Sequence, residues 1–150
     1  MIPIEKEIEA WARKNLPVYE FMDLKVINSS DGLYRCLVPL SKNTTNHIFT
    51  VHAAFQWAAA EILGGLVVLC NRKDEKYVPV VKGLNIDFKA PALSDITSTA
   101  YFADRDVVEM NSALESTGRY DFALNSKIRD TNEQVVAEAE GYYAVRVFKE

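Results

Sequence analysis

The stretch Ala53–Cys70 constrains the fold most, because Gln56 and Glu61 are its only polar side chains. Its length and composition predict one long helix, with Thr50 as a plausible N-cap. A helix that is apolar on every side is buried, so other elements must surround it. An ionisable group on such a helix is costly unless it has a partner or a function. Glu61 is therefore the first candidate functional residue.

A membrane span is the rival interpretation of this stretch, but Glu61 at its centre argues against it. The chain has 150 residues and a net charge of -4, which suits one domain and argues against a nucleic-acid surface. The charged start, Met1–Leu16, does not read as a signal peptide. Cys36 and Cys70 lack metal or redox spacing and suit a reducing compartment. We expect a cytoplasmic single domain over residues 1–150, with no metal, no other cofactor, and no membrane or nucleic-acid partner.

The rest of the chain predicts one amphipathic helix and several strands. Ile4, Ile8, Trp11 and Ala12 share a helical face that ends before Pro17. The strands expected are Asp23–Asn28, Leu33–Leu40, Val78–Phe88, Ile96–Phe102, Arg119–Arg129 and Val135–Phe148, with a short helix within Asp104–Thr117 that ends at Gly118. This order predicts an α+β fold, in which a curved antiparallel sheet wraps around one central helix at about residues 52–70.

Three sequence features together resemble a known family. The first is Asn46, then His52 six positions later, the small pair Ala53-Ala54, and an acidic residue, Glu61, on the helix. The others are the segment Phe88–Ile96 and the pair Gly118-Arg119. The chain thus resembles hotdog-fold acyl-CoA thioesterases of the PaaI and DUF4442 types, over about Leu16–Phe148. It departs from them in having alanines where two glycines are usual, and glutamate where aspartate is common.

The resemblance implies thioester hydrolysis, which needs an activated water and a site for negative charge on the carbonyl oxygen. Glu61 is the expected general base or, by resemblance, the nucleophile. The first amides of the helix, at Ala53 and Ala54, can supply the oxyanion site because they lack intrahelical partners. Asn46 is expected to fix the loop or orient water, and His52 to order the start of the helix.

The spacing of these residues implies two chains. His52 and Glu61 are nine positions apart, which is about 13 Å along a helix and roughly opposite in rotation. Two antiparallel copies of the helix across a two-fold axis bring Glu61 of one subunit to Asn46 and the Ala53–Ala54 amides of the other. We therefore expect a homodimer, which stacking can extend to a homotetramer.

Other residues are candidates for binding the substrate, an acyl-CoA or an acyl carrier protein thioester. Trp57, Gly64 and Gly65 neighbour Glu61 on the helix, where the glycines leave room either for an acyl chain or for packing. Packing is the favoured role for Gly65, and both roles stay open for Gly64. Lys89 and Arg119 are cations that can hold coenzyme A phosphates.

Two alternative functions remain open. One is a hotdog dehydratase or hydratase of 3-hydroxyacyl thioesters that uses His47, fourteen positions before Glu61. The other is a module that binds acyl-CoA without turnover, because alanines at the helix start can crowd the oxyanion site.

Overall fold

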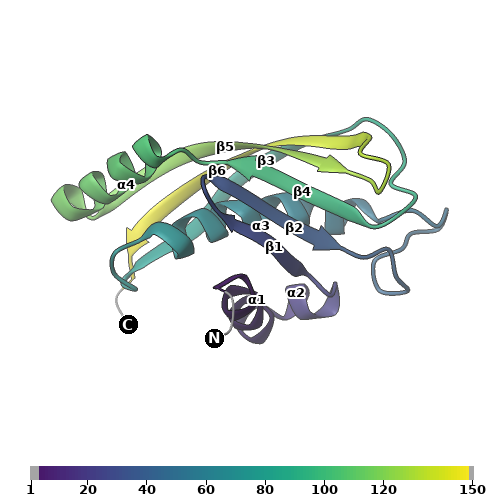
Figure 1. Cartoon of the computed structure of the whole chain (residues 1–150), viewed down its shortest axis with the longest axis horizontal. Helices are drawn as coiled ribbons and strands as arrows, with labels where there is room; N and C mark the ends of the chain where they lie inside the picture. Colours follow the sequence, from purple (N-terminus) through teal and green to yellow (C-terminus); the bar gives the residue numbers. More distant parts are fainter. Residues whose placement is uncertain (1–3, 149–150) are drawn as a thin grey trace.

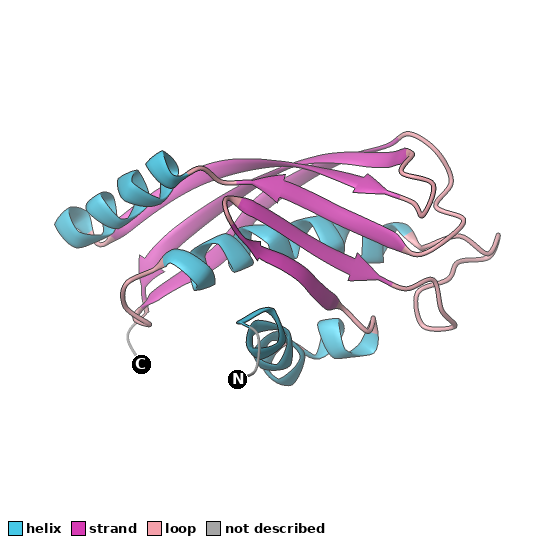
Figure 2. Cartoon of the chain, viewed as in Figure 1, coloured by secondary structure: helices cyan, strands magenta, loops and turns pink. Residues whose placement is uncertain are grey.

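The long helix α3 lies across one face of a six-stranded sheet in the computed structural model, which describes residues 4–148 (Figure 1). The sheet curves over this helix, and α4 lies at one end of the molecule (Figure 2). The elements are α1 (Ile4–Asn15), α2 (Pro17–Phe21), β1 (Lys25–Ser30), β2 (Leu33–Val38), α3 (Ala53–Asn71), β3 (Tyr77–Phe88), β4 (Ile96–Tyr101), α4 (Asp104–Thr117), β5 (Arg119–Arg129) and β6 (Val135–Val147). The predicted α+β architecture is confirmed.

The sheet is antiparallel throughout, with the strand order β1-β2-β4-β5-β6-β3. All six strands contact α3, and the core forms where Leu63, Leu66 and Val67 meet the inner face of the sheet. By length and composition α3 would also suit a membrane span, yet more than half of its most apolar stretch is buried inside this fold. The burial of α3 thus comes from the sheet that wraps it.

The two faces of the sheet follow from the two-residue period of its strands. On β5, Leu124 and Ile128 are buried against the helix, whereas Asn125 and Lys127 between them are exposed. This alternation is typical of an antiparallel sheet that covers a core with one face only.

The predicted helices and strands are confirmed, with shifts at several ends and one addition. β1 runs from Lys25 to Ser30 and not over Asp23–Asn28, and β2 ends at Val38, two residues before the predicted end. The hairpin between them closes through Asp31 and Gly32, both with positive φ (58° and 74°). Two left-handed residues make a tight turn whose twist matches the strands. The five-residue helix α2 was not predicted, and Pro17 at its first turn is well suited to start it. The expected helix that ends at Gly118 is confirmed, at 14 residues.

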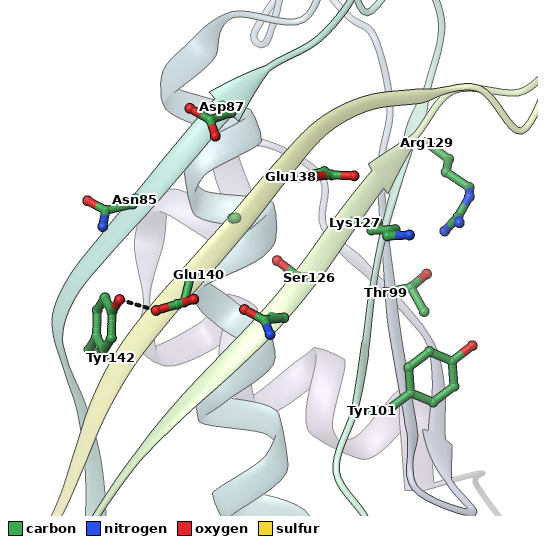
Figure 3. Close-up of a pocket in the computed structure, with 12 residues that line it drawn as sticks. Asn85, Asp87, Thr99, Tyr101, Ser126, Lys127, Arg129, Glu138, Glu140 and Tyr142 are labelled. Atoms are coloured by element: carbon green, nitrogen blue, oxygen red, sulfur yellow. Dashed lines mark hydrogen bonds between the residues drawn. The ribbon is translucent and has the colours of Figure 1, made fainter.

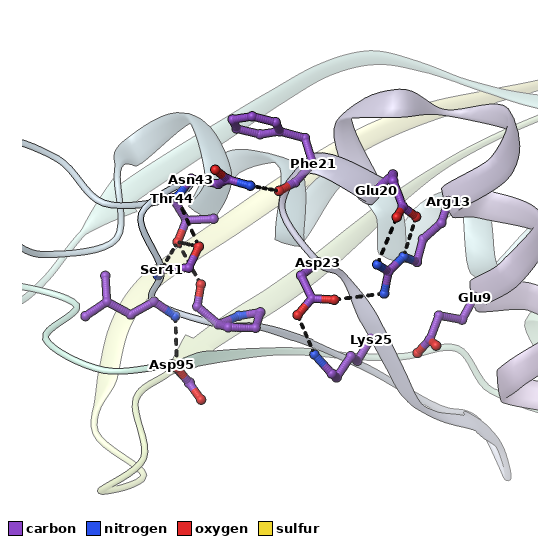
Figure 4. A network of polar contacts seen from close by, with 12 residues as sticks. Glu9, Arg13, Glu20, Phe21, Asp23, Lys25, Ser41, Asn43, Thr44 and Asp95 are labelled. Atoms are coloured by element: carbon purple, nitrogen blue, oxygen red, sulfur yellow. Dashed lines mark hydrogen bonds and ion pairs between the residues drawn. The ribbon is translucent and has the colours of Figure 1, made fainter.

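The α1–α2 corner is held by ion pairs that Figure 4 shows. The Arg13 guanidinium bonds to Glu20 at 2.7 Å and to Asp23 at 2.9 Å, and Lys25 bonds to Asp23 at 2.8 Å. The Asn43 side chain donates to the backbone oxygen of Phe21 at 2.9 Å, which joins α2 to the loop before α3. These contacts fix α2 beside the central helix.

Candidate active site

Glu61 lies midway along α3 and accepts hydrogen bonds from two tyrosine hydroxyls. The hydroxyl of Tyr19, a buried residue of α2, donates a hydrogen bond to Oε2 of Glu61. The hydroxyl of Tyr143, on β6, donates to the backbone oxygen of Glu61 at 3.1 Å. Within residues 4–148 the second carboxylate oxygen, Oε1, has no hydrogen-bond partner. One oxygen is therefore fixed, and the other is available to a ligand.

A cavity of about 500 Å³ lies beside this carboxylate. Its apolar lining comes from α1, α3 and β3 and the turn before α2: Trp11, Leu16, Ile62, Gly65, Leu69, Val78, Pro79, Val80 and Val81. Its polar lining is Tyr19, Glu61, Arg72, Glu75 and Tyr143. A mostly apolar pocket of this size with a few convergent polar groups is typical of a small-molecule site.

Burial sets the protonation behaviour of these groups. It raises the pKa of Glu61 above its usual range, and the hydrogen bond from Tyr19 partly offsets that effect. Burial is also the main reason why the pKa values of Tyr19 and Tyr143 rise, and the nearby Glu61 charge adds to it. Both phenols therefore remain donors at neutral pH, and Glu61 accepts protons more readily than an exposed glutamate.

The N-cap of α3 is His52 and not Thr50 as predicted, because Thr50 lies in the preceding loop, where it bonds to Asn46. Nδ1 of His52 accepts a hydrogen bond from the Ala54 N–H at 2.9 Å, and the His52 N–H donates to Thr44 O at 2.8 Å. The predicted oxyanion pair is thereby reduced to one amide, because the Ala54 N–H is already used. In the described part of the chain the Ala53 N–H has no acceptor, as expected for the first residue of a helix. Both alanines are exposed.

Asn46 shapes the loop before α3. Its Oδ1 accepts from the Ile48 and Thr50 N–H groups at 3.1 and 3.0 Å, and its Nδ2 donates to Thr50 Oγ1 at 2.7 Å. Both ends of the side chain are thus engaged within their own loop. His47, beside it, is exposed. Among residues 4–148, no three His, Cys, Asp or Glu side chains gather in a way that could hold a metal ion.

The structure assigns different roles to the adjacent glycines of α3: the packing role favoured for Gly65 is wrong, and Gly64, for which both roles were open, has the packing role. A Cβ on Gly64 would lie 2.2 Å from the Tyr143 ring, so Gly64 is there for close packing. A Cβ on Gly65 would meet only Ile62, at 4.0 Å, and Gly65 lines the cavity. Trp57 is half-buried and does not line this cavity.

Lys89 and Arg119 lie beside distant parts of β6. The Lys89 N–H donates to the backbone oxygen of Val136, whereas Arg119 pairs in register with Arg146, ten residues further along β6. Ten residues of strand span about 33 Å. Within one chain these two cations therefore cannot hold the same phosphate group, and neither lines the Glu61 cavity.

A second, larger hollow of about 870 Å³ lies on the exposed face of the sheet (Figure 3). Charges of both signs line it, including Asp87, Lys127, Arg129 and Glu138, and Tyr142 donates a hydrogen bond to Glu140. None of its carboxyl groups is buried among apolar side chains as Glu61 is. The smaller cavity is therefore the better candidate for chemistry.

Sequence reasoning missed Tyr19 and Tyr143, which hold Glu61, and Leu16, which lines the cavity. Tyr19 lies 42 positions before Glu61 and Tyr143 lies 82 after it, so no local spacing links them. The one available signal was Pro17, which can start a helix and so place Tyr19 on it.

Comparisons with known proteins agree with this architecture. A family model described as a domain of unknown function, DUF4442, matches residues 7–145. No curated protein matches the chain. Among solved structures, a probable thioesterase from Pseudomonas aeruginosa is 22% identical, with a TM-score of 0.84 over 98% of this chain and 99% of its own. A thioesterase from Haemophilus influenzae is 14% identical, with a TM-score of 0.78 over 100% and 96%.

A thioesterase from Staphylococcus aureus is 18% identical, with a TM-score of 0.72 over 87% of this chain and 98% of its own. Structures of that protein include variants in which a glutamine and a glutamate, fifteen positions apart, are each replaced by alanine. At these identities the structural similarity establishes the fold. The family match covers nearly all of the chain, and the sheet wraps one central helix as the resemblance implied. The chain therefore belongs to the DUF4442 family and has the hotdog fold.

Proposed function

We propose that this protein hydrolyses an acyl thioester, carried by coenzyme A or by an acyl carrier protein, with Glu61 activating the attacking water. One observation carries the proposal: a half-buried carboxylate lines a largely apolar cavity, with one oxygen held by Tyr19 and the other without a partner among residues 4–148. An acyl chain fits such a lining, and the thioester carbonyl would then lie near this second oxygen.

The chemistry follows from the raised pKa of Glu61. A carboxylate that binds protons more tightly than usual is a better general base near neutral pH. It removes a proton from water as the water attacks the carbonyl carbon, and the thiolate of the carrier leaves. Negative charge that develops on the carbonyl oxygen needs a donor, and the exposed Ala53 N–H at the helix start is suited to that task.

The proposed site is composite and needs two chains. Ala53 and Glu61 are eight positions apart, or about 12 Å along the helix, too far to act on one carbonyl. The edge strand β3 supports dimer formation, because in the described part of the chain it pairs only with β6. A long unpaired edge is a template for a second chain. Val80 and Phe88 on this strand are about half exposed, which supports the same conclusion.

The spacing of residues in the Staphylococcus aureus protein gives further support. Asn46 and Glu61 are fifteen positions apart, the same separation as the two residues replaced in that thioesterase. We therefore retain Asn46 in the proposed site as the residue that shapes the loop facing the partner's Glu61.

Thiol release from short, medium, long and aryl acyl-CoAs tests the proposal, with wild type compared to Glu61→Gln. Glu140→Gln is a matched control, because Glu140 also accepts a tyrosine hydroxyl but lies on the exposed face of the sheet. We expect the wild type and Glu140→Gln to release thiol and Glu61→Gln to lose the activity. Undiminished activity in Glu61→Gln would refute the role of Glu61. Saturable binding without thiol release would instead favour a binding module.

A further inference from the structure

We infer that Tyr19 is a positioning residue for Glu61, so that the α1–α2 segment is part of the active site. This inference rests on the proposed function. The Tyr19 hydroxyl bonds to Oε2 of Glu61, and both side chains line the same cavity. With Oε2 held, the carboxylate has one defined orientation and Oε1 remains for the attacking water.

The position of Tyr19 is itself fixed from three directions. Its neighbour Glu20 is bonded to Arg13 of α1, at 2.7 and 3.3 Å (Figure 4). The next residue, Phe21, accepts the hydrogen bond from Asn43, and its ring stacks on Phe55 of α3 with centroids 6.0 Å apart. Tyr19 itself is only 4% exposed. A donor held in this way loses little conformational entropy when it orients a carboxylate.

The polar groups that line the cavity with Glu61 are Tyr19 on α2, Tyr143 on β6, and Arg72 and Glu75 at the end of α3 and just after it. The elements α1 and β3 contribute Trp11 and apolar side chains to this lining and no titratable group. Of the polar groups, only Tyr19 bonds to the carboxylate. Its hydrogen bond lowers the pKa of Glu61 and so opposes the effect of burial. Removal of the hydroxyl should therefore leave Glu61 less ionised at a given pH, as well as less well oriented.

Tyr19→Phe tests the inference, because it removes one hydroxyl and keeps the ring in place. We expect kcat to fall by about tenfold with little change in KM, since a hydrogen bond to a charged group is worth that much or more. We also expect the acidic limb of the pH–rate profile to move to higher pH, because the hydrogen bond from Tyr19 lowers the pKa of Glu61. A purely structural role would lower stability without moving this limb.

Tyr34→Phe is the matched control. Tyr34 is also buried and its hydroxyl also has a partner, Asn71 Nδ2 at 2.6 Å, but it does not line the Glu61 cavity. Its loss should lower stability by a similar amount and leave the pH–rate profile unchanged. A profile that moves equally in both variants, or in neither, would overturn the inference.

A second measurement does not depend on turnover. Titration of the Glu61 side-chain carboxyl by carbon NMR, assigned with Glu61→Gln, should show a higher pKa in Tyr19→Phe than in the wild type. An unchanged titration would overturn the inference even if the wild type is active. If no thioester is hydrolysed, the proposed function fails, and this titration alone decides whether Tyr19 controls the ionisation of Glu61.

Discussion

The adjacent glycines of α3 should respond in opposite ways to the same substitution. A Cβ on Gly64 would lie 2.2, 2.3 and 2.5 Å from three ring atoms of Tyr143. A Cβ on Gly65 would meet only Ile62, at 4.0 Å, which is ordinary contact. Gly64→Ala and Gly65→Ala therefore add the same methyl group to neighbouring positions. The methyl group on residue 64 would clash with the Tyr143 ring, whereas the one on residue 65 would enter the cavity.

The magnitude depends on whether the Tyr143 ring can retreat. It cannot do so freely, because it lies over Gly141 on its other side and stacks on Phe122 with centroids 5.2 Å apart. Overpacking of this kind costs about 3 kcal/mol, at the upper end of the usual range. Alanine regains about 1 kcal/mol over glycine in a helix. We expect Gly64→Ala to lower the free energy of unfolding by about 2 kcal/mol, and Gly65→Ala to raise it by about 0.5–1 kcal/mol.

Urea denaturation followed by far-UV circular dichroism measures both effects. All variants must be compared at one protein concentration, because association would add its own contribution to stability. Thermal unfolding followed by the same signal should give melting temperatures that differ by about 5–12 °C between the two variants, at about 2–4 °C per kcal/mol for a chain of this size. If Gly64→Ala is as stable as the wild type, the packing of the Tyr143 ring on Gly64 is wrong.

Three further predictions concern the site. His52→Ala should lower the free energy of unfolding by about 1 kcal/mol through loss of the N-cap, and His52→Asn should restore most of it; thiol release that stays low in His52→Asn would indicate a role beyond capping. Gly65→Leu should narrow the cavity and shift the acyl-CoA profile towards shorter chains, whereas an unshifted profile would place the acyl chain elsewhere. Because the pKa of Glu61 is raised in the folded protein, stability should fall as pH rises from the ordinary glutamate pKa through the raised value. Glu61→Gln should remove this dependence and match or exceed the wild type in stability at pH 8, which urea midpoints across pH can check.

The central helix and the strands were predictable because their signals are local. The apolar run from Ala53 and the alternation along β5 each identify an element without knowledge of the rest of the chain. Glu61 was predictable for the same reason, since a lone carboxylate in an apolar helix needs an explanation. The hairpin turn was less accessible, because Ser29 and Ser30 suit a turn as well as a strand, and only the backbone at Asp31 and Gly32 decides.

The surroundings of Glu61 could not be predicted, because they depend on how distant segments pack. Tyr19 is an ordinary aromatic residue in the sequence, and its contact with Glu61 exists only because α2 folds back over the cavity. The two glycines show a related difficulty. Successive residues on a helix differ by about 100° in direction, so Gly64 faces Tyr143 while Gly65 faces the cavity. The sequence contains both glycines but not the position of the sheet relative to them.

A composite site makes a prediction that a single-chain site does not. Asn46 and the Ala54 N–H are engaged within their own chain, whereas the Ala53 N–H and Glu61 Oε1 have no partner in the part of the chain that the structure describes. Ala53→Pro removes this N–H at the first helical position, where proline is tolerated. His52, with φ -62° and ψ 143°, already has the conformation that a following proline requires.

We expect Ala53→Pro and Glu61→Gln to be inactive alone, and a mixture unfolded and refolded together to regain thiol release. Each mixed dimer would then contain one site with both an intact Ala53 and an intact Glu61. A mixture that stays inactive, although native mass spectrometry detects mixed dimers, would show that one chain supplies both groups or that the Ala53 N–H takes no part.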